Sequence, residues 1–265
     1  MAQGPAATDR ARGALYPGRL PEFTRVAAEG DAAALAEWFW VPVWDLPAGV
    51  RSPQRTLAYP AANLVVEDGR ATLWGPTTRV SERRLAGRGW AVGALLRPAA
   101  LAALCADPGD LIDGRVEIAA DALVASVSAV MPGDVPAAAT AFAHWLIERA
   151  GTPTGEARLA NEMARLLMTD AAILRIEDAA ALLSVSTRTL QRLAHRTVGL
   201  PPAAMIRRRR LQEAAQRVRD DPSAALAAIA AELGYSDQAH LAADFRTVLG
   251  ITASEYRRDA AAAPR

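Results

Sequence analysis

One short stretch of the chain carries polar side chains at the spacing of a helix face: Thr187, Arg188, Gln191 and Arg192. Residues three and four positions apart are neighbours on a helix surface, so these side chains project in a similar direction. A guanidinium group can form two hydrogen bonds with guanine O6 and N7, and a carboxamide can do the same with adenine N6 and N7. The stretch therefore has the groups that a helix needs to recognise bases in the major groove of DNA.

An internal repeat in the last third of the chain indicates the elements that would position this helix. The repeated markers are Ser184–Ser186, Leu190 and Gly199 in the first copy, and Gly234–Ser236, Leu241 and Gly250 in the second. The offset between the copies is 50 residues at the first marker and 51 at the last, so the second copy contains one extra residue. Each copy begins with an apolar helix, predicted over 176–183 and 226–233, followed by a tight turn and a second helix. This order is typical of the helix-turn-helix motif.

Capping and apolar residues support both copies. Ser186 and Ser236 are predicted to cap the second helices, because a serine oxygen can accept a hydrogen bond from a free backbone N–H group. Gly234 ends its helix without the steric cost that a side chain has in the left-handed conformation. The predicted buried face comprises Leu182, Leu190 and Leu193 in the first copy, and Ile229, Leu233, Leu241 and Phe245 in the second.

A single long helix is predicted between the copies, over 203–218, and it carries the densest positive cluster in the chain, Arg207–Arg210. Such a helix would hold the two units at a fixed distance, and about 34 Å would place both second helices in successive major grooves. Four consecutive residues point in different directions around a helix, so only one or two can contact phosphate, and we assign that role to Arg207 and Arg208. One alternative is a solvated helix face, and another is that one arginine pairs with Glu213 or with an acidic residue of the neighbouring unit.

The segment 176–258 resembles the DNA-binding domain of the AraC/XylS family of bacterial transcription regulators. The matching residues are Val185, Ser186, Leu190, Gln191 and Arg192 in the first copy, Arg209, Arg210, Leu211 and Ala214 in the long helix, and Ile229, Ala230, Gly234 to Gln238, His240, Leu241, Phe245, Gly250 and Tyr256 in the second copy. The resemblance implies that the first recognition helix reads bases through Arg188, Gln191 and Arg192. In the second recognition helix the corresponding positions are Gln238, His240, Ala242 and Ala243.

The second recognition helix departs from the family pattern. Ala242 and Ala243 stand where the family usually has a hydroxyl residue and a basic one, and alanine offers only apolar contact, for example to a thymine methyl group. We therefore expect the first copy to supply most of the sequence discrimination and the second to contact mainly the DNA backbone. His240 is either a DNA contact or a packed helix residue.

The first half of the chain has a different pattern, and the whole sequence predicts an α+β protein. Short apolar runs separated by turn residues are typical of a sheet-based domain, and Asp68-Gly69 between two such runs predicts a β-hairpin. Strands are expected at 38–42, 63–66, 71–74 and 90–96, and helices from 98, 136 and 156 onward. In the AraC/XylS family this region is commonly a cupin-like barrel that senses a ligand or dimerises. The predicted parts are a loose arm (1–30), a β-rich cupin-like domain (31–130), a helical connector (131–170) and the all-helical DNA-binding domain (171–260).

Aromatic side chains concentrate in the β-rich region, which holds five of the six tryptophans. A ligand pocket there is predicted to involve Trp40, Tyr59, Trp74 and Arg97, since aromatic residues often line small-molecule sites. The alternative is that these side chains belong to the core or to a subunit contact. All three histidines lie outside this region, so we expect neither a metal site nor a cofactor.

The composition of the 265 residues is that of a globular protein, and no apolar run approaches the roughly 20 residues of a transmembrane helix. The N-terminal residues include no apolar segment typical of a secretion signal, so we expect a cytoplasmic protein that does not contact a membrane. The net charge is +1, but residues 171–265 carry 14 arginines against 10 acidic residues. The modest positive excess therefore lies in the domain that is predicted to contact nucleic acid.

These features predict a sequence-specific DNA-binding transcription regulator and not an enzyme. The resemblance further implies an activator whose partners are double-stranded DNA, RNA polymerase, and a small-molecule effector or a second copy of the chain. The enzyme known with such a domain is a DNA-repair alkyl transferase, which needs several reactive cysteines, whereas Cys105 is the one cysteine here. The other alternative is an interaction protein that has lost DNA binding, which Ala242 and Ala243 would allow and Arg188 argues against.

Overall fold

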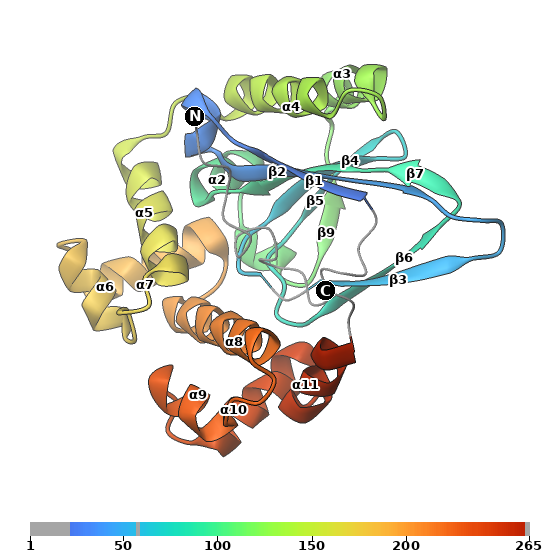
Figure 1. The fold of residues 1–265 in the computed structure, drawn as a ribbon. Helices are drawn as coiled ribbons and strands as arrows, with labels where there is room; N and C mark the ends of the chain where they lie inside the picture. Colours follow the sequence, from blue (N-terminus) through green and yellow to red (C-terminus); the bar gives the residue numbers. More distant parts are fainter. Residues whose placement is uncertain (1–21, 57–58, 263–265) are drawn as a thin grey trace, which may run out of the picture.

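A computed structural model describes residues 22–56 and 59–262, and it confirms the predicted α+β class. A β-rich layer lies at the centre of the molecule, with one pair of helices above it and the helical C-terminal region below it in the view of Figure 1. The arrangement places the two predicted helix-turn-helix units on the side of the sheet opposite to that helix pair.

The main sheet is antiparallel in all its pairings. Its strands, in spatial order, are β1 (Glu22–Ala27), β2 (Ala36–Asp45), β8 (Val92–Leu96), β4 (Asn63–Glu67), β5 (Arg70–Trp74) and β9 (Arg115–Glu117), with β7 (Arg88–Trp90) also paired to β2. Two further strands, β3 (Arg51–Thr56) and β6 (Ser81–Ala86), form a separate ribbon. Because β3 and β6 pair only with each other, no described strand joins β1 to β9. The described sheets are therefore open, and the expectation of a barrel, which the resemblance implied, is wrong.

The predicted hairpin at Asp68-Gly69 is confirmed between β4 and β5. Both turn residues have a positive φ, +48° and +72°, as two-residue turns that match the twist of the flanking strands require. Residues 22–27, in contrast, fall in the predicted loose arm and yet form the edge strand β1. Because β1 is half-buried and lacks an apolar run, its sequence does not mark it as a strand. Residues 1–21 of that arm lie outside the described residues.

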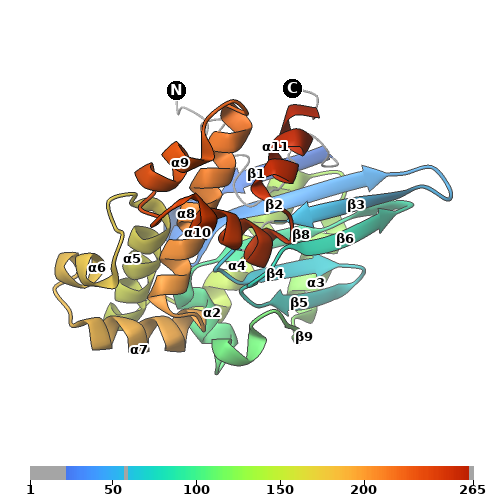
Figure 2. The same ribbon diagram turned by 90° about the horizontal axis from the view of Figure 1, so that it is seen from below.

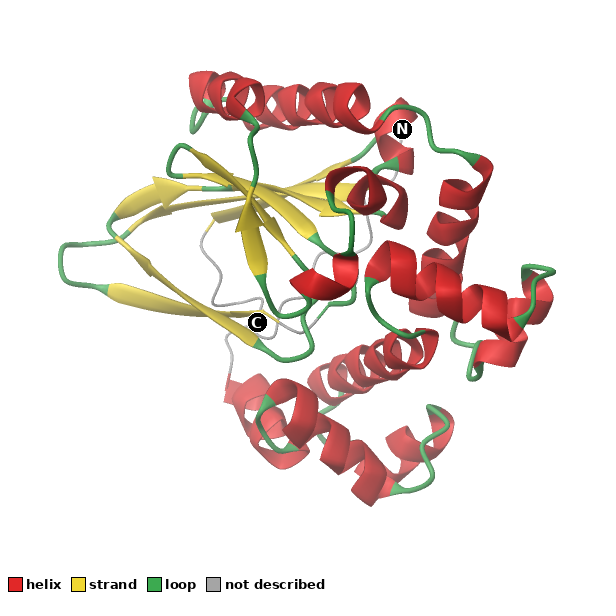
Figure 3. Cartoon of the chain, turned by 180° about the vertical axis from the view of Figure 1, so that it is seen from behind, coloured by secondary structure: helices red, strands yellow, loops and turns green. Residues whose placement is uncertain are grey.

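The helices after the sheet divide between two cores. They are α2 (Pro98–Leu104), α3 (Asp121–Val130), α4 (Val135–Ala150) and α5 (Gly155–Thr169). Two short 3-10 helices lie elsewhere: η2 (Gly30–Ala34) between β1 and β2, and η3 (Pro108–Leu111) after α2. The pair α3 and α4 covers one face of the main sheet (Figure 3), where the buried Phe142 ring lies 5.6 Å from the ring of Phe39. Met163 and Leu167 of α5 pack instead with the first helices of the C-terminal region.

The C-terminal region is entirely helical and has the predicted order of elements. They are α6 (Ile176–Leu182), α7 (Thr187–Val198), α8 (Pro202–Asp220), α9 (Leu226–Glu232), α10 (Gln238–Asp244), the π-helix η4 (Phe245–Leu249) and α11 (Ala253–Ala262). The long helix α8 joins the pair α6 and α7 to the pair α9 and α10 (Figure 2). Each pair shares a core with one half of α8. Within the described part of the chain, no helix is both long and apolar enough to cross a membrane.

Candidate nucleic-acid interface

Each pair of helices is joined by a turn of the helix-turn-helix type. In the first unit, Ser184 has a φ of +54° and Ser186 caps α7, since its Oγ accepts a hydrogen bond from the backbone N–H of Thr189 at 3.1 Å. In the second unit, Gly234 has a φ of +70°, as predicted.

The cap of the second recognition helix α10 differs from the prediction. Asp237, and not Ser236, accepts the backbone N–H of His240, at 2.8 Å. The extra residue of the second copy therefore lies in its turn, between Gly234 and the cap. The additional residue moves the cap one position along the chain, and a carboxylate is an equally good acceptor there.

The first recognition helix α7 presents its predicted polar face to solvent. Arg188, Gln191 and Arg192 are exposed, while Leu190 and Leu193 are buried. Thr187, at the start of the helix, is half-buried. Within the described residues, the three exposed side chains have no hydrogen bond or ion pair to another part of the protein. Their full hydrogen-bonding capacity is therefore available to an external partner.

Not every predicted core position of the first unit is buried. Leu182 is 63% exposed, and the buried positions of α6 are Ala179 and Ala180. The prediction for Leu182 was wrong because α6 is short and uses small side chains for its contact with α7. The four apolar residues predicted for the second unit are all buried: Ile229, Leu233, Leu241 and Phe245.

The second recognition helix α10 offers fewer groups. Gln238 and His240 are exposed, whereas Ala242 and Ala243 are half-buried. The His240 ring packs edge-on against Tyr235 with 5.2 Å between the ring centroids, and its Nδ1 lies 3.2 Å from the Oγ of Ser236. His240 thus combines an exposed position with a packing contact.

The four consecutive arginines of α8 each contact a different neighbour. Arg207 forms an ion pair with Asp244 of α10, and its Nε donates to Oδ1 at 2.8 Å. Arg209 is buried, and its Nη2 donates to the backbone oxygen of Ile173 at 2.7 Å. The alternative in which one arginine pairs with Glu213 or with the neighbouring unit is confirmed, since Arg209 Nε also lies 3.7 Å from Glu213.

The other two arginines, Arg208 and Arg210, are less exposed than Arg207. Arg208 is only 6% exposed, and burial lowers the pKa of its guanidinium while the carboxylate of Asp113 in the β-rich region acts in the opposite direction. The guanidinium of Arg210 lies 4.0 Å from the centre of the Tyr235 ring. The described conformation therefore holds Arg208 inside the protein, whereas 48% of the Arg207 side chain is exposed beside its ion pair with Asp244, and a phosphate contact of Arg207 stays a prediction.

The C-terminal end of α7 packs against the β-rich region. Gly199, which ends α7, has a φ of +82°, and a Cβ atom built there would lie 2.7 Å from the carbonyl oxygen of Pro108. In the second unit, the backbone oxygen of Val248 accepts a hydrogen bond from the N–H of Val80 at 2.9 Å. Both units are therefore in direct contact with the β-rich region.

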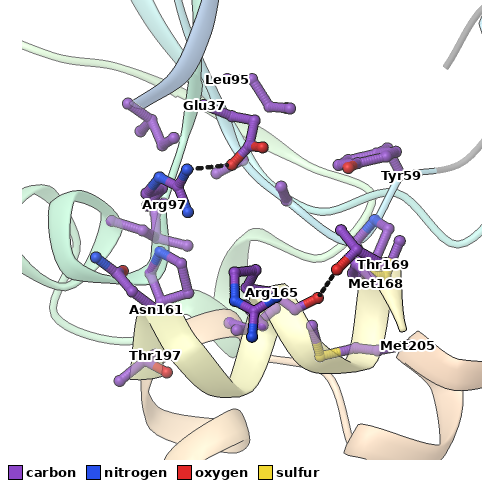
Figure 4. Close-up of a pocket in the computed structure, with 18 residues that line it drawn as sticks. Glu37, Tyr59, Leu95, Arg97, Asn161, Arg165, Met168, Thr169, Thr197 and Met205 are labelled. Atoms are coloured by element: carbon purple, nitrogen blue, oxygen red, sulfur yellow. Dashed lines mark hydrogen bonds and ion pairs between the residues drawn. The ribbon is translucent and has the colours of Figure 1, made fainter. Parts of the chain in front are cut away.

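A small cavity of about 50 Å³ lies where the β-rich region, α5 and the first unit meet (Figure 4). Two predicted pocket residues, Tyr59 and Arg97, line it. Arg97 forms a 2.7 Å ion pair with Glu37, and Asn161 links α5 to the β-rich region by donating to the backbone oxygen of Ala34 at 2.7 Å. The lining residues that the sequence did not indicate include Glu37, Asn161, Arg165, Met168, Thr169, Thr197 and Met205.

The two predicted tryptophans lie elsewhere. Trp40 donates its indole N–H to Asn63 at 2.9 Å and covers the sheet above Gly93, where a Cβ atom would lie 2.2 Å from the ring. Trp74 packs under the guanidinium of Arg115 at 4.6 Å. Both are half-buried, and neither lines the cavity. In the described residues, no three His, Cys, Asp or Glu side chains gather as a metal site would require.

Two family models match the chain. A helix-turn-helix domain matches residues 179–259, and a domain of unknown function, DUF6597, matches residues 16–117. The chain carries an AraC-type DNA-binding domain. With this AraC-type domain, the protein is a DNA-binding transcription regulator.

No curated protein matches the chain. Among solved structures, it is similar to an AraC-type transcriptional regulator from Chromobacterium violaceum, with 27% identity over 39% of this chain and 92% of that one at a TM-score of 0.36. It is also similar to the C-terminal domain of the response regulator AraT from Geobacillus stearothermophilus, with 21% identity over 38% and 84% of the two chains at a TM-score of 0.35. The similarity to ToxT from Vibrio cholerae spans 89% of this chain and 95% of that one, with 12% identity and a TM-score of 0.40.

Proposed function

We propose that one copy of this chain binds a two-part DNA site, with α7 and α10 in successive major grooves. The observation that carries the proposal is the free polar face of α7, where Arg188, Gln191 and Arg192 are exposed and have no partner among the described residues. A recognition helix needs such side chains, because base edges are read by bidentate hydrogen bonds from arginine and glutamine. The fixed connection through α8 supports a constant spacing between the two units.

The two units would have different tasks. The second unit exposes Gln238 and His240 but has alanines at two further base-facing positions of the family pattern. It would therefore act mainly through the DNA backbone and set the register of the complex. The division of the chain at about residue 170 into a β-rich part and a DNA-binding part belongs to the same proposal.

A gel-shift titration of the full chain on the DNA upstream of its own gene, at 50 and 200 mM salt, tests the proposal. We expect a shifted complex whose affinity falls steeply with salt, by at least tenfold, because phosphate contacts release counterions. Absence of a complex at the lower salt concentration would favour the alternative of an interaction protein that has lost DNA binding.

The proposal also gives the β-rich region a regulatory task, as the sensor of a small effector or as a dimerisation domain. The cavity beside Tyr59 and Arg97 supports the first, because Thr197 of α7 and Met205 of α8 line the same cavity. A ligand there would contact the β-rich region and the first DNA-binding unit together. In this proposal the DNA-bound protein activates transcription through RNA polymerase.

Thermal unfolding against a panel of small carboxylic acids, alcohols and sugars tests the effector site. A compound at 100 times its Kd should stabilise the protein by about 2.7 kcal/mol. We expect the stabilisation to be lost in Arg97→Met and kept in Arg149→Met, which changes an exposed arginine of α4. Equal stabilisation of both variants would place the effector site elsewhere.

A further inference from the structure

The second recognition helix ends on a fully buried carboxylate. Asp244 is the last residue of α10 and has 0% exposure, although burying an ionised carboxylate without a partner is very costly. Its partner is Arg207 of α8, 37 positions earlier in the chain, which donates to Oδ1 through Nε at 2.8 Å and also through Nη2. Two nitrogens of one planar guanidinium, Nε and Nη2, thus donate to the same carboxylate oxygen, which fixes the direction of the contact.

A second arginine of α8 holds the turn that precedes the same helix. The guanidinium of Arg210 lies 4.0 Å from the centre of the Tyr235 ring, and Tyr235 is 6% exposed. Burial raises the pKa of the Tyr235 hydroxyl, and the nearby Asp244 carboxylate raises it further. The hydroxyl therefore stays protonated, and the turn and the end of α10 belong to one cluster with the two arginines.

Tyr235 of this cluster also takes part in the apolar contacts that attach the second unit to α8. Those contacts come from the later half of the helix, from Leu211, Ala214 and Val218, which pack with Phe245 and Tyr256. Apolar burial is not directional, and by itself it leaves the angle between α8 and α10 weakly determined. The hydrogen bonds of Arg207 and the cation–π contact of Arg210 are directional, and both arginines lie in the earlier half of α8, next to the first unit.

We propose that Arg207 and Arg210 are positioning residues that fix the second recognition helix on α8 and thereby set the half-site spacing that the protein accepts. The inference rests on the proposed two-groove binding mode and adds the device that defines its geometry. The two arginines act through Asp244 and Tyr235 and not through DNA phosphates. Their loss therefore changes which spacing is preferred more than it changes overall affinity.

The test uses the full-length chain and duplexes that carry the sequence enriched from a random DNA pool. The distance between the two half-sites is varied by up to three base pairs in each direction, and a further duplex keeps the first half-site alone. The variants are Arg207→Met, Asp244→Asn and, as a matched control, Arg217→Met. Arg217 also lies on α8 and pairs with an acid of the second unit, Glu232, but that pair is exposed.

For the wild type and Arg217→Met, we expect affinity to fall at least tenfold when the spacing changes by two base pairs. For Arg207→Met and Asp244→Asn, we expect the difference between spacings to shrink to less than threefold, with binding to the first half-site alone unchanged within twofold. Asp244→Asn separates a positioning role of Arg207 from a phosphate contact, because this substitution removes no positive charge. If Arg207→Met does not fold, Asp244→Asn serves as the test in its place. Wild-type spacing preference in folded Asp244→Asn would overturn the inference. A wild type without any spacing preference would instead contradict the two-groove binding mode itself.

Discussion

Replacing Arg188 or Gln191 with alanine is expected to weaken binding to the preferred DNA sequence by about 5- to 150-fold, while non-specific binding changes little. Each side chain is exposed on α7 and has no partner among the described residues, so its removal leaves the fold intact. A bidentate contact with a base is worth about 1–3 kcal/mol of discrimination, which corresponds to this range. Competition titrations with specific and random duplexes at constant salt measure both quantities.

The matched control is Gln238→Ala on α10. It is expected to lower affinity for all sequences by a similar, smaller factor, because in the proposed binding mode the second unit contributes mainly backbone contacts. If Arg188→Ala and Gln191→Ala kept the sequence preference and Gln238→Ala abolished it, the division of tasks between the two units would be wrong.

The second large effect is expected from Gly199→Ala, at the end of the first recognition helix. The residue has a φ of +82°, and its new Cβ would lie 2.7 Å from the oxygen and 2.8 Å from the carbon of the Pro108 carbonyl. The left-handed conformation alone costs alanine about 1 kcal/mol. Because the obstructing atoms are backbone, η3 must also move, and we expect a total loss of about 3 kcal/mol. Thermal unfolding of the full chain measures this loss.

The internal repeat supplies a control for this substitution. Gly250 is the equivalent residue of the second unit, with a φ of +69°, and nothing lies within 4 Å of a Cβ atom built there. Gly250→Ala should therefore show the conformational cost alone, about 1 kcal/mol. Equal losses for the two substitutions would mean that the contact between α7 and the β-rich region contributes nothing to stability.

Much of the C-terminal region could be predicted because its signals are local. The Ser186 cap and the apolar spacing of Leu190 and Leu193 act within one or two helical turns, and the structure has them as predicted. The hairpin at Asp68-Gly69 depends on two residues that tolerate positive φ, which is again a local property. Local preferences of this kind can be read directly from the order of residues.

The features that escaped prediction depend on contacts between distant segments. Arg208 and Arg209 look like a solvated basic cluster in the sequence, but they are buried because the β-rich region and the chain around Ile173 pack on α8. The cavity includes Asn161 and Thr197 because α5 and α7 meet the sheet there. The periodicity of the sequence predicts each helix but not where the helices meet the sheet. β1 was missed since it is an edge strand with a half-buried, mixed sequence.

Selection of DNA fragments from genomic and random pools by the purified full-length chain tests the central claim most directly. The account predicts an enriched motif in two parts about one helical turn, or 10–10.5 base pairs, apart. One part should be strongly constrained, with guanine and adenine at the positions read by Arg188, Arg192 and Gln191, and the other should be degenerate. Enrichment of no motif, or of a motif in which both parts are equally constrained, would contradict it.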